Sequence, residues 1–541
     1  MTLTRNVMLV GLLLSTWVAA ASADDKPIDE AQLEADGAVI GNIVLTKHDV
    51  FDLTDERENN FLYRLINRMH IITKDDVIEK QLLLKPGEPY SKRLADETER
   101  ILRRRIYLYD ATIEPVNLEN GIVDLHITTK DVWTLKPGIT ASRKGGENRS
   151  GVDLEELNLF GGGQEIRIAR IDDIDRTSKS FEFRDPHIKD SWFVGSLNLA
   201  DNSDGHSNFA SLIRPFYALD TRWSFGASGF DDEHRTALYS QGEEAAEFQH
   251  EHELYSLFGG WSAGLQDGWV RRYRAGITID DNKFGSVADG SLPAIVPADR
   301  RLIYPFVGVE ILQDEFEKTN NKEQIGRTED FFMGQRFSAT LGYSTESLSA
   351  DRNALMYAAS YSRGFGSLQS KALLTSAWTN GRMESGDSKN ALFGFDARFY
   401  FRQSEKRMFF ATLEGVHGHA LDVDTVVELG GETGLRGYPL RYQNGDAKLL
   451  LTMEQRFFWD WYPFRLFRVG GAVFADAGRV WGENAVGEPE QRWLRDVGFG
   501  LRFAPTRSGF GKIVHLDIAF PLDGDASIDD VQILLESKSS F

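Results

Sequence analysis

Apolar and polar side chains alternate residue by residue through most of the chain, from Leu135 to the C-terminal Phe541. Successive side chains of a β-strand point to opposite faces, so this alternation predicts strands. The clearest run, 391–401, has one row of Ala391, Phe393, Phe395, Ala397, Phe399 and Phe401, opposite Leu392, Gly394, Asp396, Arg398 and Tyr400. Charges recur opposite the apolar row in strand after strand. That arrangement favours a transmembrane β-barrel, which is apolar toward lipid and polar toward its lumen.

The length of this region bears on the number of strands. Residues 135–541 accommodate about 16 antiparallel strands, an even number as in bacterial single-chain barrels, and about 14 or about 18 fit the pattern as well. We expect the polar stretches near Gly145 and at 232–247, 280–299 and 320–329 to form long extracellular loops.

Composition excludes some classes of protein and favours others. The formal net charge is −21, whereas a nucleic-acid binder presents a basic surface, so we expect no nucleic-acid partner. There are 50 Gly, 35 Phe, 16 Tyr and 11 Trp against 15 Pro, a mix that suits many strands joined by tight turns. The acidic balance fits a water-filled lumen and polar loops.

The N-terminus has the layout of a secretory signal peptide. Arg5 supplies positive charge, an apolar stretch runs from Val7 to Val18, and Ala21-Ser22-Ala23 forms an A-x-A cleavage site. We therefore expect residues 1–23 to be removed and 24–37 to be a solvated linker. No later stretch approaches 18 uninterrupted apolar residues, so an exported membrane protein of this sequence must cross the bilayer as a β-barrel.

A small α+β domain is predicted between the linker and the barrel. Both expected helices carry an apolar stripe that we expect to pack against one sheet. Asn120-Gly121 marks a hairpin between the last two strands. The expected elements are a strand at 39–45, a helix at 58–69, a turn at 85–91, a helix from Ser91 through Leu102, and strands at 107–113 and 122–129.

This order of elements, with the KPGEPYS turn at 85–91, resembles a POTRA domain, the periplasmic module of outer-membrane assembly barrels. The resemblance implies a periplasmic location for residues 24–134 and contact with an assembly partner through residues 38–134. An unrelated small α+β domain is the alternative.

The most informative segment is glycine-rich and brackets one arginine. Residues 430–439 read GGETGLRGYP, and four glycines within eight residues allow backbone conformations that side chains would forbid. Segments resembling further barrel motifs follow in a fixed order: MEQRF at 453–457, VGGAVFADAG at 469–478, DVGFGLR at 496–502 and LDIAFPL at 516–522.

This series resembles the C-terminal half of the BamA/TamA-type superfamily, also called the bacterial surface antigen family. The resemblance implies that Arg436, Gly437 and Tyr438 form the tip of a loop that folds back into the lumen. It also implies that Arg436 pairs with an inward carboxylate, Asp476, in the pattern Phe474, Asp476, Gly478. Glu454, on the polar face of the preceding strand, is a second candidate partner.

The end of the chain both fits and departs from this family. Phe541 is the C-terminal aromatic residue typical of outer-membrane barrels, but Ser537, Ser539 and Ser540 replace the usual apolar residues before it. We expect this polar last strand to pair weakly with the first strand, which begins near Leu135. In the superfamily that seam is thought to open laterally. The chain also has room for one POTRA-like module, where better-known relatives have several.

No motif in the sequence predicts an enzyme once its predicted structural context is considered. Gly260–Gly264 matches G-x-S-x-G but lies in a strand pattern, whereas a nucleophile elbow needs a strand, a turn and a helix. The pairs His250 and His252, and His417 and His419, have no identified third metal ligand. We therefore expect no enzyme, metal or cofactor; a barrel hydrolase is the competing enzyme hypothesis.

The sequence thus predicts an integral outer-membrane barrel that assists insertion or translocation of unfolded or secreted client proteins and is surrounded by outer-membrane lipid. No nucleotide is available outside the inner membrane, so client folding energy would have to drive the process. A passive channel or lipid-handling barrel on the same scaffold is the alternative.

Overall fold

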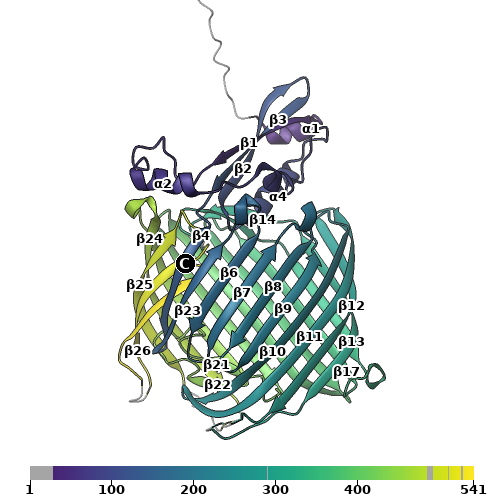
Figure 1. Cartoon of the computed structure of the whole chain (residues 1–541), viewed down its shortest axis with the longest axis vertical. Coiled ribbons are helices and arrows are strands. Elements are labelled where there is room, and N and C mark those ends of the chain that lie inside the picture. Colours follow the sequence, from purple (N-terminus) through teal and green to yellow (C-terminus); the bar gives the residue numbers. More distant parts are fainter. Residues whose placement is uncertain are drawn as a thin grey trace, which may run out of the picture.

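The computed structural model describes residues 28–541 except 289, 291, 484–485, 487–491, 510 and 525–527. The predicted signal peptide, 1–23, lies outside the described residues. A small domain sits on one end of a large barrel (Figure 1). We call this the domain end of the barrel and the opposite one the far end. No described helix is long and apolar enough to cross a membrane.

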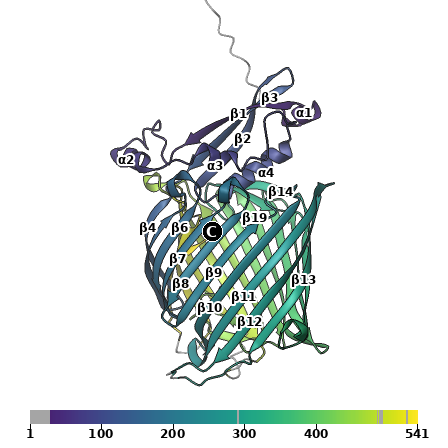
Figure 2. The ribbon, with the colours of Figure 1, turned by 45° about the vertical axis from the view of Figure 1, so that its right-hand side comes forward.

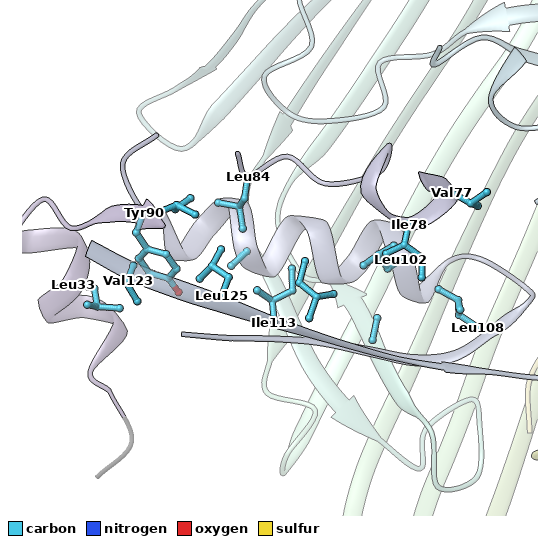
Figure 3. Packing of buried hydrophobic residues seen from close by; sticks show 14 of the residues in the cluster. Leu33, Val77, Ile78, Leu84, Tyr90, Leu102, Leu108, Ile113, Val123 and Leu125 are labelled. Atoms are coloured by element: carbon cyan, nitrogen blue, oxygen red, sulfur yellow. The ribbon is translucent and has the colours of Figure 1, made fainter. Parts of the chain in front are cut away.

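The small domain has a three-stranded sheet in the order β1-β3-β2, in which β3 runs parallel to β1 and antiparallel to β2. Helix α4 covers one face of the sheet, and Figure 3 shows buried side chains between the two, with Leu102 of α4 next to Ile78 and with Leu125 and Ile113 on the side of the sheet. The elements are α1 (Glu30–Ala35), β1 (Val39–His48), α2 (Phe61–Met69), α3 (Asp75–Glu79), α4 (Lys92–Arg103), β2 (Leu108–Glu119) and β3 (Ile122–Asp131).

Part of the predicted linker is folded. Within residues 28–37, α1 is capped by Asp29, whose carboxylate accepts the backbone N–H of Ala31 at 3.0 Å. Leu33 joins the core of the domain, and Glu30 forms an ion pair of 2.9 Å with Lys92. The linker prediction was wrong here because a six-residue helix with one apolar anchor shows no periodicity to read.

The apolar stripe of α2 does not pack on the sheet, contrary to expectation. Phe61, Leu62, Leu65 and Met69 are exposed, and α2 instead contacts the segment that follows β1. The Tyr63 ring stacks on Phe51 with centroids 4.0 Å apart. Helical periodicity identified an apolar face but not what covers it.

The barrel is closed and antiparallel, with twenty strands among the described residues. About 16 was therefore too few. The estimate assumed evenly sized strands, but six strands of eight to ten residues are compressed into 135–214. The first ten strands are β4 (Leu135–Lys144), β5 (Glu147–Glu156), β6 (Glu165–Asp172), β7 (Thr177–Asp185), β8 (Val194–Asn202), β9 (Gly205–Arg214), β10 (Trp223–Ser240), β11 (Glu243–Gln266), β12 (Trp269–Gly285) and β13 (Arg300–Gln313).

The second ten strands complete the wall and return to β4. They are β16 (Arg336–Ser344), β17 (Ala354–Gly366), β18 (Lys371–Glu384), β19 (Asp387–Ser404), β20 (Arg407–His419), β23 (Ala447–Phe458), β24 (Phe467–Trp481), β25 (Leu494–Pro505), β26 (Ile513–Pro521) and β27 (Gln532–Lys538). Four 3₁₀ turns are η1 (Leu159–Gly161), η2 (Ile188–Asp190), η3 (Glu346–Leu348) and η4 (Pro463–Arg465).

The wall has an apolar exterior. In β24, Val473 is exposed outward, while Phe474 and Asp476, on the opposite face of the strand, are buried toward the lumen. The same alternation gives exposed apolar residues around the barrel, including Ile139, Val152, Leu154, Ile168, Leu199, Leu257, Val307, Phe393, Phe499 and Ile533. The exterior is therefore compatible with a hydrocarbon solvent.

Three of the four expected long loops are something else. Gly145 lies in a two-residue turn, 145–146, between β4 and β5. Residues 232–247 continue β10 and β11, which extend beyond the shorter strands (Figure 2) and turn at 241–242. Residues 320–329 belong to an inserted hairpin, 314–335, made of β14 (Phe316–Asn320) and β15 (Thr328–Phe332). This inserted hairpin lies at the domain end, not on the predicted extracellular side, since it contacts the small domain.

The barrel closes at a seam between β27 and β4. In these two fully described strands one pair is in register, Leu535 with Arg143. Every other pair of neighbouring barrel strands has at least seven registered pairs, the number found for β13 with β16 and β26 with β27. The weak pairing expected for the polar last strand is present.

Candidate functional site

A loop from the far end returns into the lumen. This returning loop, residues 420–446, joins β20 to β23 and carries a short hairpin of β21 (Val427–Leu429) and β22 (Gln443–Gly445). A Cβ at Gly430 would lie 2.4 Å from the Pro439 carbonyl oxygen, and Gly434 has a φ of +116°. The glycines are thus needed where the loop doubles on itself.

Arg436, at the tip of the returning loop, lies between two carboxylates. Its Nε and Nη2 donate to the two oxygens of Asp476 at 2.8 and 2.9 Å, and Nη1 donates to Glu454 Oε1 at 2.8 Å. The guanidinium also stacks on Phe474, with Cζ 3.4 Å from the ring centroid. Only 5% of Arg436 is exposed, so this planar fork has exchanged water for protein acceptors.

The two residues after Arg436 hold the tip against β25. Gly437 donates its backbone N–H to Asp496 Oδ2 at 3.0 Å, and a Cβ on Gly437 would lie 2.7 Å from Asp496 Cβ. Tyr438 is fully buried; its hydroxyl donates to the Arg495 carbonyl at 2.7 Å and accepts the Arg495 N–H at 3.0 Å. The RGY segment therefore makes specific contacts at all three residues.

Glu454 continues the network toward the domain end. Its second oxygen accepts from Arg456 Nε at 2.8 Å, and Arg456 Nη1 donates to the Lys322 carbonyl of the inserted hairpin at 3.0 Å. The Cζ atom of Arg456 also lies 3.7 Å from the ring centroid of Phe410, and 5.3 Å from that of Phe541. A series of ion-pair, hydrogen-bond and cation–π contacts thus connects the returning loop, the wall, the inserted hairpin and the C-terminus.

Phe541 is packed inside this end of the barrel. Its ring lies 4.9 Å from that of Phe458, in an apolar cluster that includes Ile325 of the inserted hairpin. Gln324 of the same hairpin donates to the Ser539 carbonyl at 2.7 Å. The end of the chain is thus packed against the inserted hairpin inside the barrel.

The inserted hairpin is folded around one carboxylate. Glu329 accepts three backbone N–H groups, from Lys322 at 2.9 Å, Glu323 at 2.8 Å and Gln324 at 3.1 Å. Burial nevertheless outweighs these donors and raises the pKa of Glu329 to about 7. Next to it, Asp330 forms a bidentate pair of 2.7 Å with Arg103 of the small domain.

Several residues of this site were not assigned from the sequence. Asp496 and Arg456 contact the loop tip and its partner, and Arg502 and Asp517 form a fully buried ion pair beside them. All four belong to the ordered C-terminal segments and occupy the lumenal row of their strands. That alternation was the available signal, but it does not say which lumenal charges meet across the barrel.

The serine of the G-x-S-x-G match and the histidines of the first pair are hydrogen-bonded to residues of the same or the next strand. Ser262 is buried in β11 and accepts the Gly264 N–H at 3.0 Å. His250 and His252 bond to Asn282 and Asp280, each at 3.0 Å. Among the described residues, His515, Asp517 and Glu536 lie close enough to hold a metal ion.

Those two carboxylates already have cationic partners. Asp517 pairs with Arg502, and Glu536 pairs with Lys538 and with Lys144 across the seam, the latter at 2.9 Å. A divalent cation would have to displace these positive charges, so the group does not point to a metal site.

Comparisons with known proteins identify structures but no family. No family model and no curated protein matches the chain. Among solved structures, BamA from Haemophilus ducreyi lacking POTRA domains 1–3 matches at 12% identity, covering 92% of this chain and 84% of that chain, with a TM-score of 0.38. CdiB from Acinetobacter baumannii matches at 12% identity, covering 93% and 74%, with a TM-score of 0.46. CdiB from Escherichia coli matches at 10% identity, covering 93% and 76%, with a TM-score of 0.44.

Proposed function

We propose that this chain is a non-enzymatic outer-membrane barrel that assists the insertion or translocation of other proteins. In this proposal the small domain is a single POTRA-like module in the periplasm and meets client chains or an assembly partner there. The apolar exterior of the wall supports a lipid environment, because exposed aliphatic and aromatic side chains repeat around the barrel.

The seam is the observation that carries the proposal. Leu535 and Arg143 are the one residue pair formed between β27 and β4, so the rest of their facing edges is not paired strand to strand. Unpaired backbone groups at a strand edge are a template for another strand. A client strand could therefore add to β4 or β27, and its own folding would supply the driving force.

A cavity at the seam supports the same interpretation. It has a volume of about 900 Å³ and is lined by outward-facing Ile139 and Leu535 as well as lumenal Lys136, Lys144 and Glu536. Lumen and exterior therefore meet at this point. The mixed lining also suits an amphipathic lipid, which keeps lipid handling as the second candidate.

A permanently open channel is less well supported. At the domain end, the inserted hairpin and Phe541 contribute to a buried apolar cluster inside the barrel, and the returning loop enters from the far end. Passage of a solute would require these segments to move.

Cross-linking the seam tests the proposal directly. The chain contains no cysteine, so a disulfide between Arg143→Cys and Leu535→Cys would join the one registered pair without competing thiols. We expect the lock to abolish client assembly in cells and reductant to restore it. The matched control, Leu516→Cys with Leu535→Cys, joins β26 to β27 and should leave assembly intact.

Depletion of the protein supplies the cellular readout. Outer-membrane proteomics after depletion should show loss of particular barrel proteins or secreted proteins. Unchanged levels of all of them, with altered lipid composition or solute uptake, would support a lipid-handling barrel or a channel instead. Recovery of the mature protein in the soluble periplasm would contradict the barrel's membrane location.

A further inference from the structure

We propose that α2 is a membrane-surface anchor, whose exposed apolar face lies in the headgroup region of the phospholipid leaflet next to the domain end. The inference rests on the proposed membrane location of the barrel. It assigns a partner, a lipid surface, to a helix face that the protein itself leaves uncovered.

The exposed face is continuous and strongly apolar. Phe61, Leu62, Leu65 and Met69 are 75%, 55%, 40% and 60% exposed. At about 100° per residue these four side chains fall within roughly 100° of the helix circumference. Four large apolar side chains on two and a half turns form a surface that water disfavours.

The orientation of this face is fixed by contacts on the opposite side of the helix. The Asn67 side chain accepts the Phe51 N–H at 3.1 Å and donates to the Phe51 carbonyl at 2.8 Å. Tyr63 stacks on Phe51, and its hydroxyl bonds to the Phe464 carbonyl. Turning α2 to hide its apolar face would break all of these contacts, so the face is held outward.

The face continues the apolar exterior of the barrel. The loop that carries η4, between β23 and β24, exposes Phe464 (77%) and Trp461 (57%) at the domain end of the wall. Figures 1 and 2 both show α2 at the edge of the barrel next to this rim, and in Figure 2 it reaches outward beyond the wall. Aromatic residues at this level of a barrel mark the membrane interface, and α2 lies next to them.

Charge on the helix fits the same partner. Arg64 and Arg68 are exposed and adjoin the apolar arc on the side of Phe61. Arginines beside an apolar helix face bind lipid phosphates while their aliphatic stems lie along the apolar surface. A leaflet containing anionic phospholipid is therefore the occupant that matches both the apolar arc and its basic border.

Site-specific labelling of the full chain tests this placement. Phe61→Cys and Met69→Cys each introduce the sole thiol for an environment-sensitive fluorophore. The protein is reconstituted in vesicles of phosphatidylethanolamine and phosphatidylglycerol, and quenching by nitroxide-labelled lipid is compared with quenching by aqueous iodide. Val473→Cys on the exterior wall and Glu119→Cys on the small domain are the lipid and water references.

We expect the labels on α2 to be quenched by the nitroxide lipid, as at residue 473, with iodide quenching largely lost relative to residue 119. Arg64→Glu combined with Arg68→Glu should reduce the lipid quenching of the α2 labels and leave that of residue 473 unchanged. This outcome would assign both the apolar arc and its basic border to the leaflet.

Two other outcomes would overturn the anchor. Labels on α2 that respond to iodide, with residue 473 still quenched by lipid, would place the helix in water while the barrel stays in the membrane. Labels shielded from both quenchers would show that protein, such as a second copy of the chain, covers the face. If residue 473 itself responds to iodide, the membrane location in the proposed function fails instead.

Discussion

Arg436 carries one positive charge against the two carboxylates it contacts, and the surplus negative charge is balanced by Arg456 on the far side of Glu454. Such a cluster is stable only while complete, because each buried ion relies on its partners to replace its hydration. The loop tip is thus held by this ionic cluster as well as by the apolar contacts of the buried Leu435 and Tyr438.

Removing Arg436 should release the returning loop and leave the barrel folded. Arg436→Ala leaves Asp476 without its cationic partner beside Asp496, whereas Glu454 keeps its pair with Arg456. Breaking a buried pair of this kind costs about 3–5 kcal/mol. We expect faster proteolysis within 420–446 and impaired assembly, with unchanged heat-modifiable migration of the barrel. Arg436→Lys should rescue only in part, because an ammonium cannot reproduce the bidentate fork.

Two comparisons keep this prediction specific. Arg441 lies in the same loop but outside the network around Arg436, and it forms a bidentate pair with Asp175 between β6 and β7. Arg441→Ala should therefore have a weaker effect. Combining Arg436→Ala with Asp476→Asn should be less damaging than adding the single effects implies. Strict additivity would argue against coupling between Arg436 and Asp476.

A methyl group at Gly437 should be nearly as harmful as the loss of Arg436. The added Cβ would meet Asp496 Cβ at 2.7 Å and the Pro521 nitrogen at 3.1 Å, so Gly437→Ala must move the tip away from β25. Thermal unfolding and loop proteolysis measure the effect. Gly259→Ala is the matched control, since nothing lies within 4 Å of its Cβ, and it should behave like the unmodified protein.

A motif resemblance supplied the pairing of Arg436 with Asp476, and the alternation added Glu454 as a lumenal residue of the preceding strand. The alternation supplied only the face on which each side chain lies. Asp496, on the lumenal row of β25, gave no such signal: its bond is to the backbone N–H of Gly437, and backbone partners have no identity in a sequence.

At the scale of elements, the inserted hairpin is the point where three parts meet. Its Asp330 pairs with Arg103 of the small domain, its Lys322 carbonyl accepts from the wall residue Arg456, and its Gln324 bonds to Ser539 after the last strand. A few polar contacts of this hairpin therefore connect the small domain to the wall and to the residues that follow the last strand.

The inserted hairpin should loosen as the pH rises. The pKa of Glu329 is about 7 in the fold and 4.5 when unperturbed, so the protonated carboxyl is favoured by folding. The resulting stabilisation is complete below about pH 4.5 and is lost as the pH rises through about 7. Proteolysis within 321–327 should be faster at pH 8 than at pH 5.5 once the protease's own pH dependence is corrected.

Glu329→Gln should remove this pH dependence, because the amide does not titrate. The comparison variant is Glu317→Gln, which removes another carboxylate of the inserted hairpin. Glu317 accepts backbone N–H groups from outside the hairpin, from Leu368 at 2.9 Å and Gln369 at 3.2 Å. This variant should leave the dependence in place. Equal pH profiles for Glu329→Gln and the unmodified protein would assign the effect to another group.

For the whole molecule, the closed antiparallel barrel followed from alternation, but the number of strands did not. Strand number depends on where turns fall, and 135–214 packs short strands between two-residue and longer turns that the pattern cannot separate. The inserted hairpin was assigned to the wrong end because polarity does not distinguish a solvent loop from one packed against another domain. The exposed face of α2 was assigned to the sheet because periodicity identifies a stripe without its partner.

The seam should open more readily than the rest of the wall in the intact molecule. β4 is paired along its length with β5, and β27 with β26, so each seam strand is hydrogen-bonded mainly on one side. β24 and β25 share twelve registered pairs and each has a second partner. Amide hydrogen exchange should therefore be at least about tenfold faster in 135–144 and 532–538 than in β24 and β25, as expected when local opening costs about 1.4 kcal/mol less. The Arg143→Cys, Leu535→Cys disulfide should slow exchange on both seam strands, whereas uniform protection around the barrel without that lock would show that the seam is no weaker than the rest of the wall.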